Sequence, residues 1–312
     1  MMGTRAALVP APAGGPLAGP AVQAPDQQTG DESTGDDVDT SKSPAAVQPV
    51  WSKPTALWPG SPLLRQLREA PIRVRCFGAR EVWCGDRLLQ IGDPELLLLL
   101  AVHPVTGIQT EALVDMLWDD VPADSGAALR KERYVLRNEL RDLIPEKADP
   151  VPGNQSHGEK VVSLDTAIVS SDVHEFSELL NWAGTLDTAA AVEVYEAALA
   201  LYRGDLLDSA DMPSYRWMYD EDPQVALTLR SDYRRRQKEA RLRLAELLAG
   251  GAAAGLGRAQ ELYEGLCAED PEDERLWTAL FHVHERTGSS LGLESAVRRL
   301  RAFTGRAWCR CG

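Results

Sequence analysis

The sequence is poor in cysteine and lacks long apolar runs. It has five cysteines in 312 residues, none in a C-x-x-C pair, and this odd count favours a reducing compartment over a disulfide framework. Its longest apolar run, Leu96–Val102, is far shorter than the ~20 residues of a membrane span. Prolines and glycines interrupt the N-terminal stretch, so no signal peptide is expected. These absences predict a cytoplasmic protein without membrane contact.

Positive charge is also scarce. The formal net charge is −14 and the sequence pI is about 4.9, which excludes a protein that coats nucleic acid through its global charge. Any contact with nucleic acid must therefore come from a local patch. The chain is long enough for two domains.

Motifs for catalysis are missing as well. The sequence contains no P-loop, G-x-G-x-x-G, H-E-x-x-H or G-x-S-x-G pattern. His282 and His284 are two positions apart on an expected helix, so they point in different directions and cannot share a metal. His103 and His174 are isolated and are interpreted as helix-end or surface histidines. We expect neither enzymatic activity, nor a cofactor, nor a metal site.

The chain divides into four segments by composition. Residues 1–70 are rich in Pro, Ala, Gly and Asp and lack apolar periodicity, which predicts a disordered tail. Residues 71–168 predict a short antiparallel meander, three helices and a final strand. Residues 170–303 predict helices throughout, and residues 304–312 a ragged tail. The expected fold is mainly α with small antiparallel β-structure.

The first domain has the order of elements of a winged helix-turn-helix. Its first helix, expected from Pro94 onward, is apolar nearly all round and should be the centre of the core. A second helix follows Thr110. A third begins after Asp124 or Ser125 and continues to Leu143. The short connection between these two helices is typical of a helix-turn-helix, and the following strand would belong to the wing.

The second domain shows a weak internal repeat. Ala191, Tyr195 and Ala198 are followed 68 residues later by Ala259, Tyr263 and Leu266. This offset is twice the ~34-residue period of tetratricopeptide (TPR) helical hairpins. One further period brings Leu293, Val297 and Leu300, whereas the stretch around 225–232 is irregular. The pattern predicts a TPR-like array of α-helical hairpins.

The helix over residues 128–143 separates its charges by face. Five basic and three acidic side chains share it, and Leu129, Leu136 and Leu140 form a stripe for burial. An arginine-rich flank with tyrosine and asparagine suits duplex DNA, because guanidinium groups pair with phosphates and guanine edges. The alternative is a solvated helix whose arginines pair with Asp119, Asp120 or Asp124. The candidate DNA-binding residues on this flank are Arg130, Arg133, Tyr134, Arg137, Asn138 and Arg141.

A second basic cluster lies at residues 230–243. It carries seven basic and two acidic side chains, distributed around the helix except along one apolar stripe. This pattern favours a structural or interdomain role, with nucleic-acid binding as the alternative.

In their order along the chain, these segments resemble a family of actinobacterial antibiotic-regulatory (SARP) activators. The stretch TGIQTEALVDMLWDDVPADSGAALRKERYVLRNELRDLIP resembles their OmpR/PhoB-type winged helix. SDVHEFSELL, with Asp172 and Phe176, resembles the start of their TPR-like bacterial transcriptional activator domain (BTAD). ALALYRGDLL and AEDPEDERLWTALFHVHERTG resemble its later parts. The resemblance implies that Lys131 also lies on the recognition helix, and that His157 and Lys160 lie in or near the wing.

Two functions follow from these features. The resemblance implies a transcriptional activator whose winged helix binds duplex DNA and whose BTAD supports homodimerisation and contact with RNA polymerase. The alternative is a TPR-like protein-interaction module with a degenerate winged helix that does not bind DNA, which the acidity of the chain favours.

Overall fold

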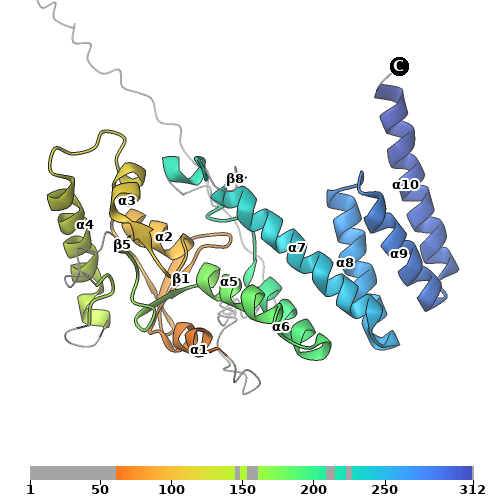
Figure 1. The fold of residues 1–312 in the computed structure, drawn as a ribbon, viewed down its shortest axis with the longest axis horizontal. Coiled ribbons are helices and arrows are strands. Elements are labelled where there is room, and N and C mark those ends of the chain that lie inside the picture. The colour runs from red at the N-terminus through yellow and green to blue at the C-terminus, as the bar shows by residue number, and fades with distance from the viewer. Residues whose placement is uncertain (1–60, 145–147, 153–160, 209–214, 223–226, 311–312) are drawn as a thin grey trace, which may run out of the picture. The chain divides into compact units, whose positions relative to one another are not determined.

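The computed structural model describes residues 61–144, 148–152, 161–208, 215–222 and 227–310. All of them belong to the second of two units, residues 48–312. Most of the expected tail and residues 153–160 thus lie outside the described residues. The first part of the described chain consists of α1 (Pro62–Glu69), β1 (Ile72–Arg75), β2 (Glu81–Cys84), β3 (Arg87–Leu89), α2 (Glu95–Val102), β4 (Ile108–Gln109), α3 (Thr110–Leu117), α4 (Ser125–Leu140), β5 (Val161–Val162) and β6 (Val169–Ser171) (Figure 1).

The N-terminal tail ends earlier than the composition indicates. The prediction of a tail up to residue 70 is wrong at its end, because Pro62–Glu69 forms α1. The hydroxyl oxygen of Ser61 accepts a hydrogen bond from the backbone N–H of Leu64, and Leu64 and Leu67 are buried. The sequence carries the signal, an N-capping serine followed by proline and two leucines three apart.

The main sheet is mixed rather than antiparallel. Its strand order is β3-β2-β1-β6. The meander β1-β2-β3 is antiparallel as predicted, but β6 runs parallel to β1, with Ile72 opposite Val169. The expectation of antiparallel β-structure alone is therefore wrong. Alternating residues reveal a strand, but they do not reveal a partner strand that is about 100 residues away in sequence.

The apolar helix α2 is the centre of the core, as predicted. Every residue of Leu96–Val102 is buried. Its start differs by one residue from the expectation: Pro94 is the N-cap, and the Asp93 carboxylate accepts from the Glu95 N–H at 3.3 Å. A helix that is apolar on all sides needs neighbours on all sides, and the sheet, α4 and α5 supply them.

The predicted helix-turn-helix is formed by α3 and α4. The carboxylate of Asp124 caps α4 by accepting from the Ala127 N–H at 2.8 Å, and a single 3-10 turn follows the helix at Arg141–Leu143. Strand β4, just before α3, pairs antiparallel with β5, so Ile108 lies opposite Val162. This small sheet joins the start of the helix-turn-helix to the chain that follows residue 160.

Gly107 makes this small sheet possible, and its replacement is expected to be harmful. Its φ is +88°, and a Cβ atom there would lie 2.5 Å from the Val162 carbonyl oxygen. We expect Gly107→Ala to separate β4 from β5 and to lower the free energy of unfolding by about 2 kcal/mol or more. Denaturant unfolding would measure this loss. The control is Gly85→Ala, where φ is +58° but a Cβ would contact nothing. Equal losses in both variants would contradict the steric argument.

The rest of the described chain is mainly helical. Its helices are α5 (Asp172–Ala183), α6 (Thr188–Leu201), α7 (Leu229–Gly250), α8 (Leu256–Glu269), α9 (Glu274–Thr287) and α10 (Ser290–Arg310). Two short strands, β7 (Glu221–Asp222) and β8 (Leu227–Thr228), lie between α6 and α7. Each helix packs against the next one in the chain (Figure 1). The repeated residue triplets lie on α6, α8 and α10. The described part of the irregular stretch contains β8 and the beginning of α7. Helix α10 extends to Arg310, so the expected ragged tail from 304 is wrong.

The buried residues form two cores, and neither ends at the expected boundary near 168–170. The first core extends from Leu64 to Tyr233 and contains the sheet, α2, α5 and part of α6. The second extends from Leu244 to Ala296. Helix α7 contributes Tyr233 to the first and Leu244 to the second. In the described residues, the helix-turn-helix therefore shares its core with the beginning of the helical array.

The C-terminal carbonyls of α2 show how this shared core is fixed. A helix end leaves carbonyls without partners in the helix. Here the Ala101 carbonyl accepts from the Ser171 hydroxyl at 2.7 Å and the Val102 carbonyl from the Tyr233 hydroxyl at 3.0 Å. The His103 carbonyl accepts from Nε2 of His174 at 2.7 Å. Side chains of the helical array thus cap the central helix of the first domain.

His174 is buried, which corrects its interpretation as an isolated surface or helix-end residue. It is 3% exposed, and burial lowers its pKa to about 4. His103 does lie at a helix end, where its Nδ1 donates to the Leu99 carbonyl at 2.8 Å. The sequence gives no sign that the two histidines, 71 residues apart, are neighbours.

The pKa of His174 predicts a dependence of stability on pH. The unfolded chain takes up a proton near pH 6.5, whereas the folded chain resists it until about pH 4. The free energy of unfolding therefore loses a contribution as pH falls from 6.5 to 4. As the pH falls from 7.5 to 4, we expect the free energy of unfolding of His174→Gln to rise by about 3 kcal/mol relative to that of the wild type. Denaturant unfolding of both proteins across this range tests it, and parallel curves would contradict it.

Asp172 forms a second buried link between the sheet and the helical array. Its side chain has no exposed surface, and its two oxygens accept from the backbone N–H groups of Cys76 at 2.8 Å and Phe77 at 3.2 Å. Arg203 donates to the same carboxylate at 2.9 Å. Burial raises the pKa of Asp172 to about 6, against the opposing effect of these partners. Nearby, the Phe77 ring contacts Phe176 and Tyr233 edge to face.

Candidate nucleic-acid interface

Helix α4 is positioned by its apolar stripe. Leu129, Leu136 and Leu140 are buried in the first core, as the sequence predicted. Asp124 fixes the first turn, and the side-chain carboxylate of Glu139 accepts from the Gly92 N–H at 3.1 Å. The helix is therefore held at both ends and along one side, while its opposite side faces outward.

Two of the candidate arginines are used within the chain. Arg137 Nε donates to Oδ1 of Asp149 at 3.0 Å, and Arg133 Nη2 donates to the Val151 carbonyl at 2.7 Å. Both side chains are half-buried, and burial lowers the pKa of Arg133. These two residues hold the segment 148–151 against α4. The expected alternative partners were Asp119, Asp120 and Asp124, and for these two arginines that expectation is wrong.

The remaining basic side chains form an outward edge, which we call the α4 outer edge and define as Arg130, Lys131, Tyr134 and Arg141. All four are exposed, and Tyr134 keeps 58% of its surface. Within the described parts of the chain, Arg130 and Lys131 form no ion pair. Asn138 is half-buried, and its side-chain oxygen accepts from Arg141 Nη2. Lys160 and His157 lie outside the described residues.

Arg216 makes contacts that the sequence did not predict. It reaches from the helical array to α3, where its Nη2 donates to the Asp115 carbonyl at 2.6 Å and its Nη1 lies 3.0 Å from Asp119 Oδ1. The neighbouring Trp217 donates from Nε1 to the Glu95 carboxylate at 3.2 Å. No local pattern signals these contacts, because the partners are about 100 residues apart. They connect both α2 and α3 to the array.

The second basic cluster has the structural role that the sequence favoured. Arg230 donates to the Leu206 carbonyl at 3.0 Å, Lys238 lies 2.7 Å from Asp270, and Arg241 pairs with Glu269. Each of its other arginines pairs with a carboxylate of the described chain, as Arg234 does with Asp205. Arg230, Arg234, Lys238 and Arg241 thus join α7 to neighbouring segments. The ion pairs of Arg235, Arg236 and Arg243 lie within α7.

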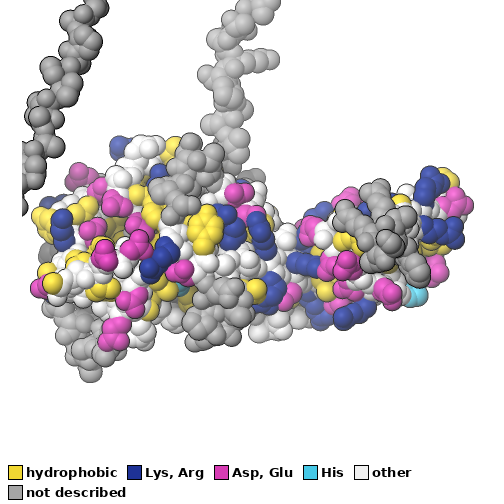
Figure 2. All heavy atoms as spheres, turned by 90° about the horizontal axis from the view of Figure 1, so that it is seen from above, with side chains coloured by type: hydrophobic (Ala, Val, Ile, Leu, Met, Phe, Trp, Pro, Cys, Tyr) yellow, Lys and Arg dark blue, Asp and Glu magenta, His cyan; other side chains and the backbone are white. Residues whose placement is uncertain are grey.

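The described part of the face in Figure 2 does not carry a broad field of one sign. Basic and acidic side chains are interspersed on the face shown in Figure 2. Among the described residues, no group of three or more His, Cys, Asp or Glu side chains is arranged to hold a metal, and no helix has the length and apolarity needed to cross a bilayer. The α4 outer edge is therefore a local feature in an acidic protein.

Comparison with known proteins identifies the helical array. Residues 171–301 match the family of the bacterial transcriptional activator domain, so the chain carries a BTAD. The fold is similar to that of EmbR of Mycobacterium tuberculosis, solved in complex with a low-affinity phosphopeptide, with a TM-score of 0.54 and 18% identity. The similarity covers 75% of this chain and 60% of the EmbR chain, so it spans only part of that protein. No curated protein sequence matches the chain.

Proposed function

We propose that this BTAD-containing chain regulates transcription by binding duplex DNA through the α4 outer edge. The matched domain itself points to transcriptional regulation, in a family of activators rather than of catalysts. The single observation that carries the finer proposal is the outward face of α4, the second helix of a helix-turn-helix. It presents three cationic side chains and an exposed tyrosine.

The geometry of α4 suits the major groove. A helix of 16 residues is about 24 Å long and fits this groove across one recognition site. Arg130, Tyr134 and Arg141 recur at helical spacing, so they face one side together. The arginines would pair with phosphates or guanine edges, and the tyrosine hydroxyl would donate to a phosphate. Arg133 and Arg137 would act indirectly, because they hold the segment 148–151 beside the recognition helix.

The BTAD would supply contacts to other proteins. TPR-like arrays offer extended surfaces to partners. A second copy of the chain or RNA polymerase is the partner that this domain would contact.

A specific observation also favours the alternative function. Because Arg133 and Arg137 are used within the chain, the outward basic surface of α4 is smaller than the sequence indicates, and Glu139 and Asp142 are exposed beside it. A TPR-like interaction module with a winged helix that does not bind DNA would have these features.

Titration against DNA separates the two functions. The full-length protein would be titrated against labelled duplexes selected from a random pool, at several salt concentrations. Binding with a log–log salt slope of several units would support the regulator, because each phosphate contact adds about 0.9 to this slope. Absence of binding to any selected duplex would favour the protein-interaction module.

A further inference from the structure

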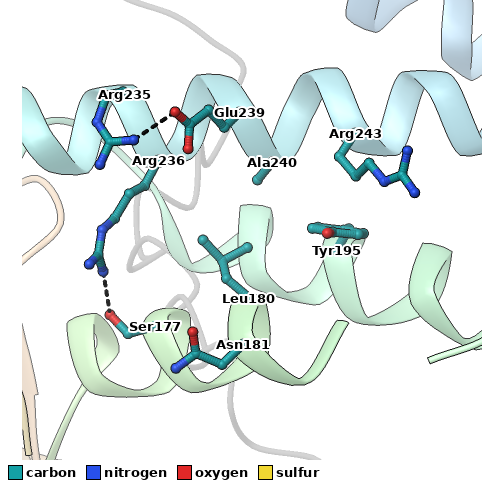
Figure 3. A pocket seen from close by; sticks show the side chains of 9 residues that line it. All are labelled: Ser177, Leu180, Asn181, Tyr195, Arg235, Arg236, Glu239, Ala240 and Arg243. Atoms are coloured by element: carbon teal, nitrogen blue, oxygen red, sulfur yellow. Dashed lines mark hydrogen bonds and ion pairs between the residues drawn. The ribbon is translucent and has the colours of Figure 1, made fainter. Parts of the chain in front are cut away.

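A pocket in the helical array lies apart from the α4 outer edge. Its volume is about 350 Å³, and it lies between α5, α6 and α7. Leu180 of α5, Tyr195 of α6 and Ala240 of α7 supply apolar surface (Figure 3). The other six lining residues are polar or charged. The volume lies in the range of about 300–1,000 Å³ that is typical of small-molecule sites.

One wall of this pocket is cationic. Arg235, Arg236 and Arg243 of α7 line it, and among the described lining residues Glu239 is the only carboxylate. Asp232 and Glu246 of α7, outside the lining, also pair with these arginines. Ser177 and Asn181 of α5 lie on the facing side, where they add a hydroxyl group and an amide (Figure 3).

The arginines have ion pairs, yet they keep donors for a ligand. Arg243 lies 2.9 Å from Glu246, and Arg235 lies 2.6 Å from both Asp232 and Glu239. Arg236 lies 2.9 Å from Asp232 and donates to the Ser177 hydroxyl at 3.4 Å. A guanidinium group has five N–H donors, of which each such pair uses one or two. Exposed pairs within one helix contribute only about 0.2–1 kcal/mol. A bound anion can therefore compete with these carboxylates or share the guanidinium groups with them.

We propose that this pocket binds a small organic anion, with a flat apolar body and a carboxylate or phosphate group. The body would lie against Leu180 and the Tyr195 ring, and the charged group would meet Arg236 and Arg243. The volume suits a small molecule better than a folded partner. Because the lining residues come from α5, α6 and α7, such a ligand would contact the three helices together, and its binding would stabilise the array.

Calorimetric titration of the full-length protein with 1-naphthyl phosphate tests this site without DNA. We expect saturable binding with one site per chain and at least about tenfold weaker binding of inorganic phosphate, which lacks the apolar body. The variant Arg243→Gln removes a cation, and Asn181→Glu adds a negative charge from an exposed position on the facing helix. Each is expected to weaken binding of 1-naphthyl phosphate by about tenfold or more.

The matched control is Arg258→Gln. Arg258 is another arginine with exposed carboxylate partners, Glu196 and Glu261, and it does not line the pocket. The Arg258→Gln variant should bind 1-naphthyl phosphate like the wild type. In thermal unfolding, 1-naphthyl phosphate should raise the Tm of the wild type and of Arg258→Gln equally, and should raise the Tm of Arg243→Gln and Asn181→Glu less. Absence of saturable binding at millimolar concentration, or unchanged binding by Asn181→Glu, would overturn the proposal.

Discussion

Replacing Arg130, Lys131 and Arg141 together with alanine is expected to weaken binding to duplex DNA by roughly 100-fold at about 0.15 M salt. The three cations are exposed along α4 and at the start of the 3-10 turn that follows it, and each is expected to neutralise one phosphate. Each lost contact lowers the log–log salt slope by about 0.9, so the variant should lose about 2.7 units of slope. Titration of both proteins at several salt concentrations measures affinity and slope together.

A charge-matched variant separates contact from global charge. Arg275, Arg298 and Arg301 are exposed on α9 and α10, and their replacement with alanine changes the net charge by the same amount. We expect this variant to bind DNA nearly like the wild type, because its charges do not lie on the recognition helix. An equal loss in both variants would assign the affinity to global charge and contradict the α4 outer edge as the interface.

A single replacement on the inner side of α4 should behave differently. Arg137 pairs with Asp149 and faces the segment 148–151, so Arg137→Ala would act through this segment instead of a lost phosphate. Its salt slope should therefore stay close to that of the wild type, even where its affinity falls. Only the structure makes this distinction, because helical spacing in the sequence places Arg133 and Arg137 on the same flank as Arg130 and Arg141.

Local sequence patterns predict the elements that depend on interactions between residues close together in the chain. Asp124 as a helix cap, the buried leucines of α4 and the all-apolar α2 follow from capping and periodicity, which involve residues within a few positions of one another. Helix α1 had the same kind of signal, but the surrounding Pro- and Ala-rich composition obscured it.

What the sequence could not predict depends on contacts between distant segments. Strand β1 pairs parallel with β6, Arg133 donates to the Val151 carbonyl, and Arg216 donates to a carbonyl of α3. Each contact joins residues that no sequence period relates. Asp172 is the clearest case. The resemblance marked its position, but its burial and its partners at residues 76, 77 and 203 come only from the fold.

Asp172→Ala is expected to lower the free energy of unfolding by about 3–5 kcal/mol. The replacement would leave the N–H groups of Cys76 and Phe77 without their acceptor in a buried site, and Arg203 without its carboxylate. Since these groups join the sheet to the helical array, the shared core would lose its link on this side. Denaturant unfolding at pH 7.5, where the carboxylate of pKa about 6 is ionised, measures the loss.

A double-mutant cycle shows whether the charge pair or the backbone contacts dominate. Arg203→Ala removes the cation, whose side chain is 30% exposed, and leaves the buried carboxylate to its two N–H donors. If the pair dominates, the double variant should be more stable than the sum of the two single losses predicts. If the backbone contacts dominate, the losses should nearly add, because alanine at 172 leaves both N–H groups unpaired whether or not Arg203 is present. A loss below about 1 kcal/mol in Asp172→Ala would contradict both versions, since it would mean that water or another acceptor replaces the carboxylate.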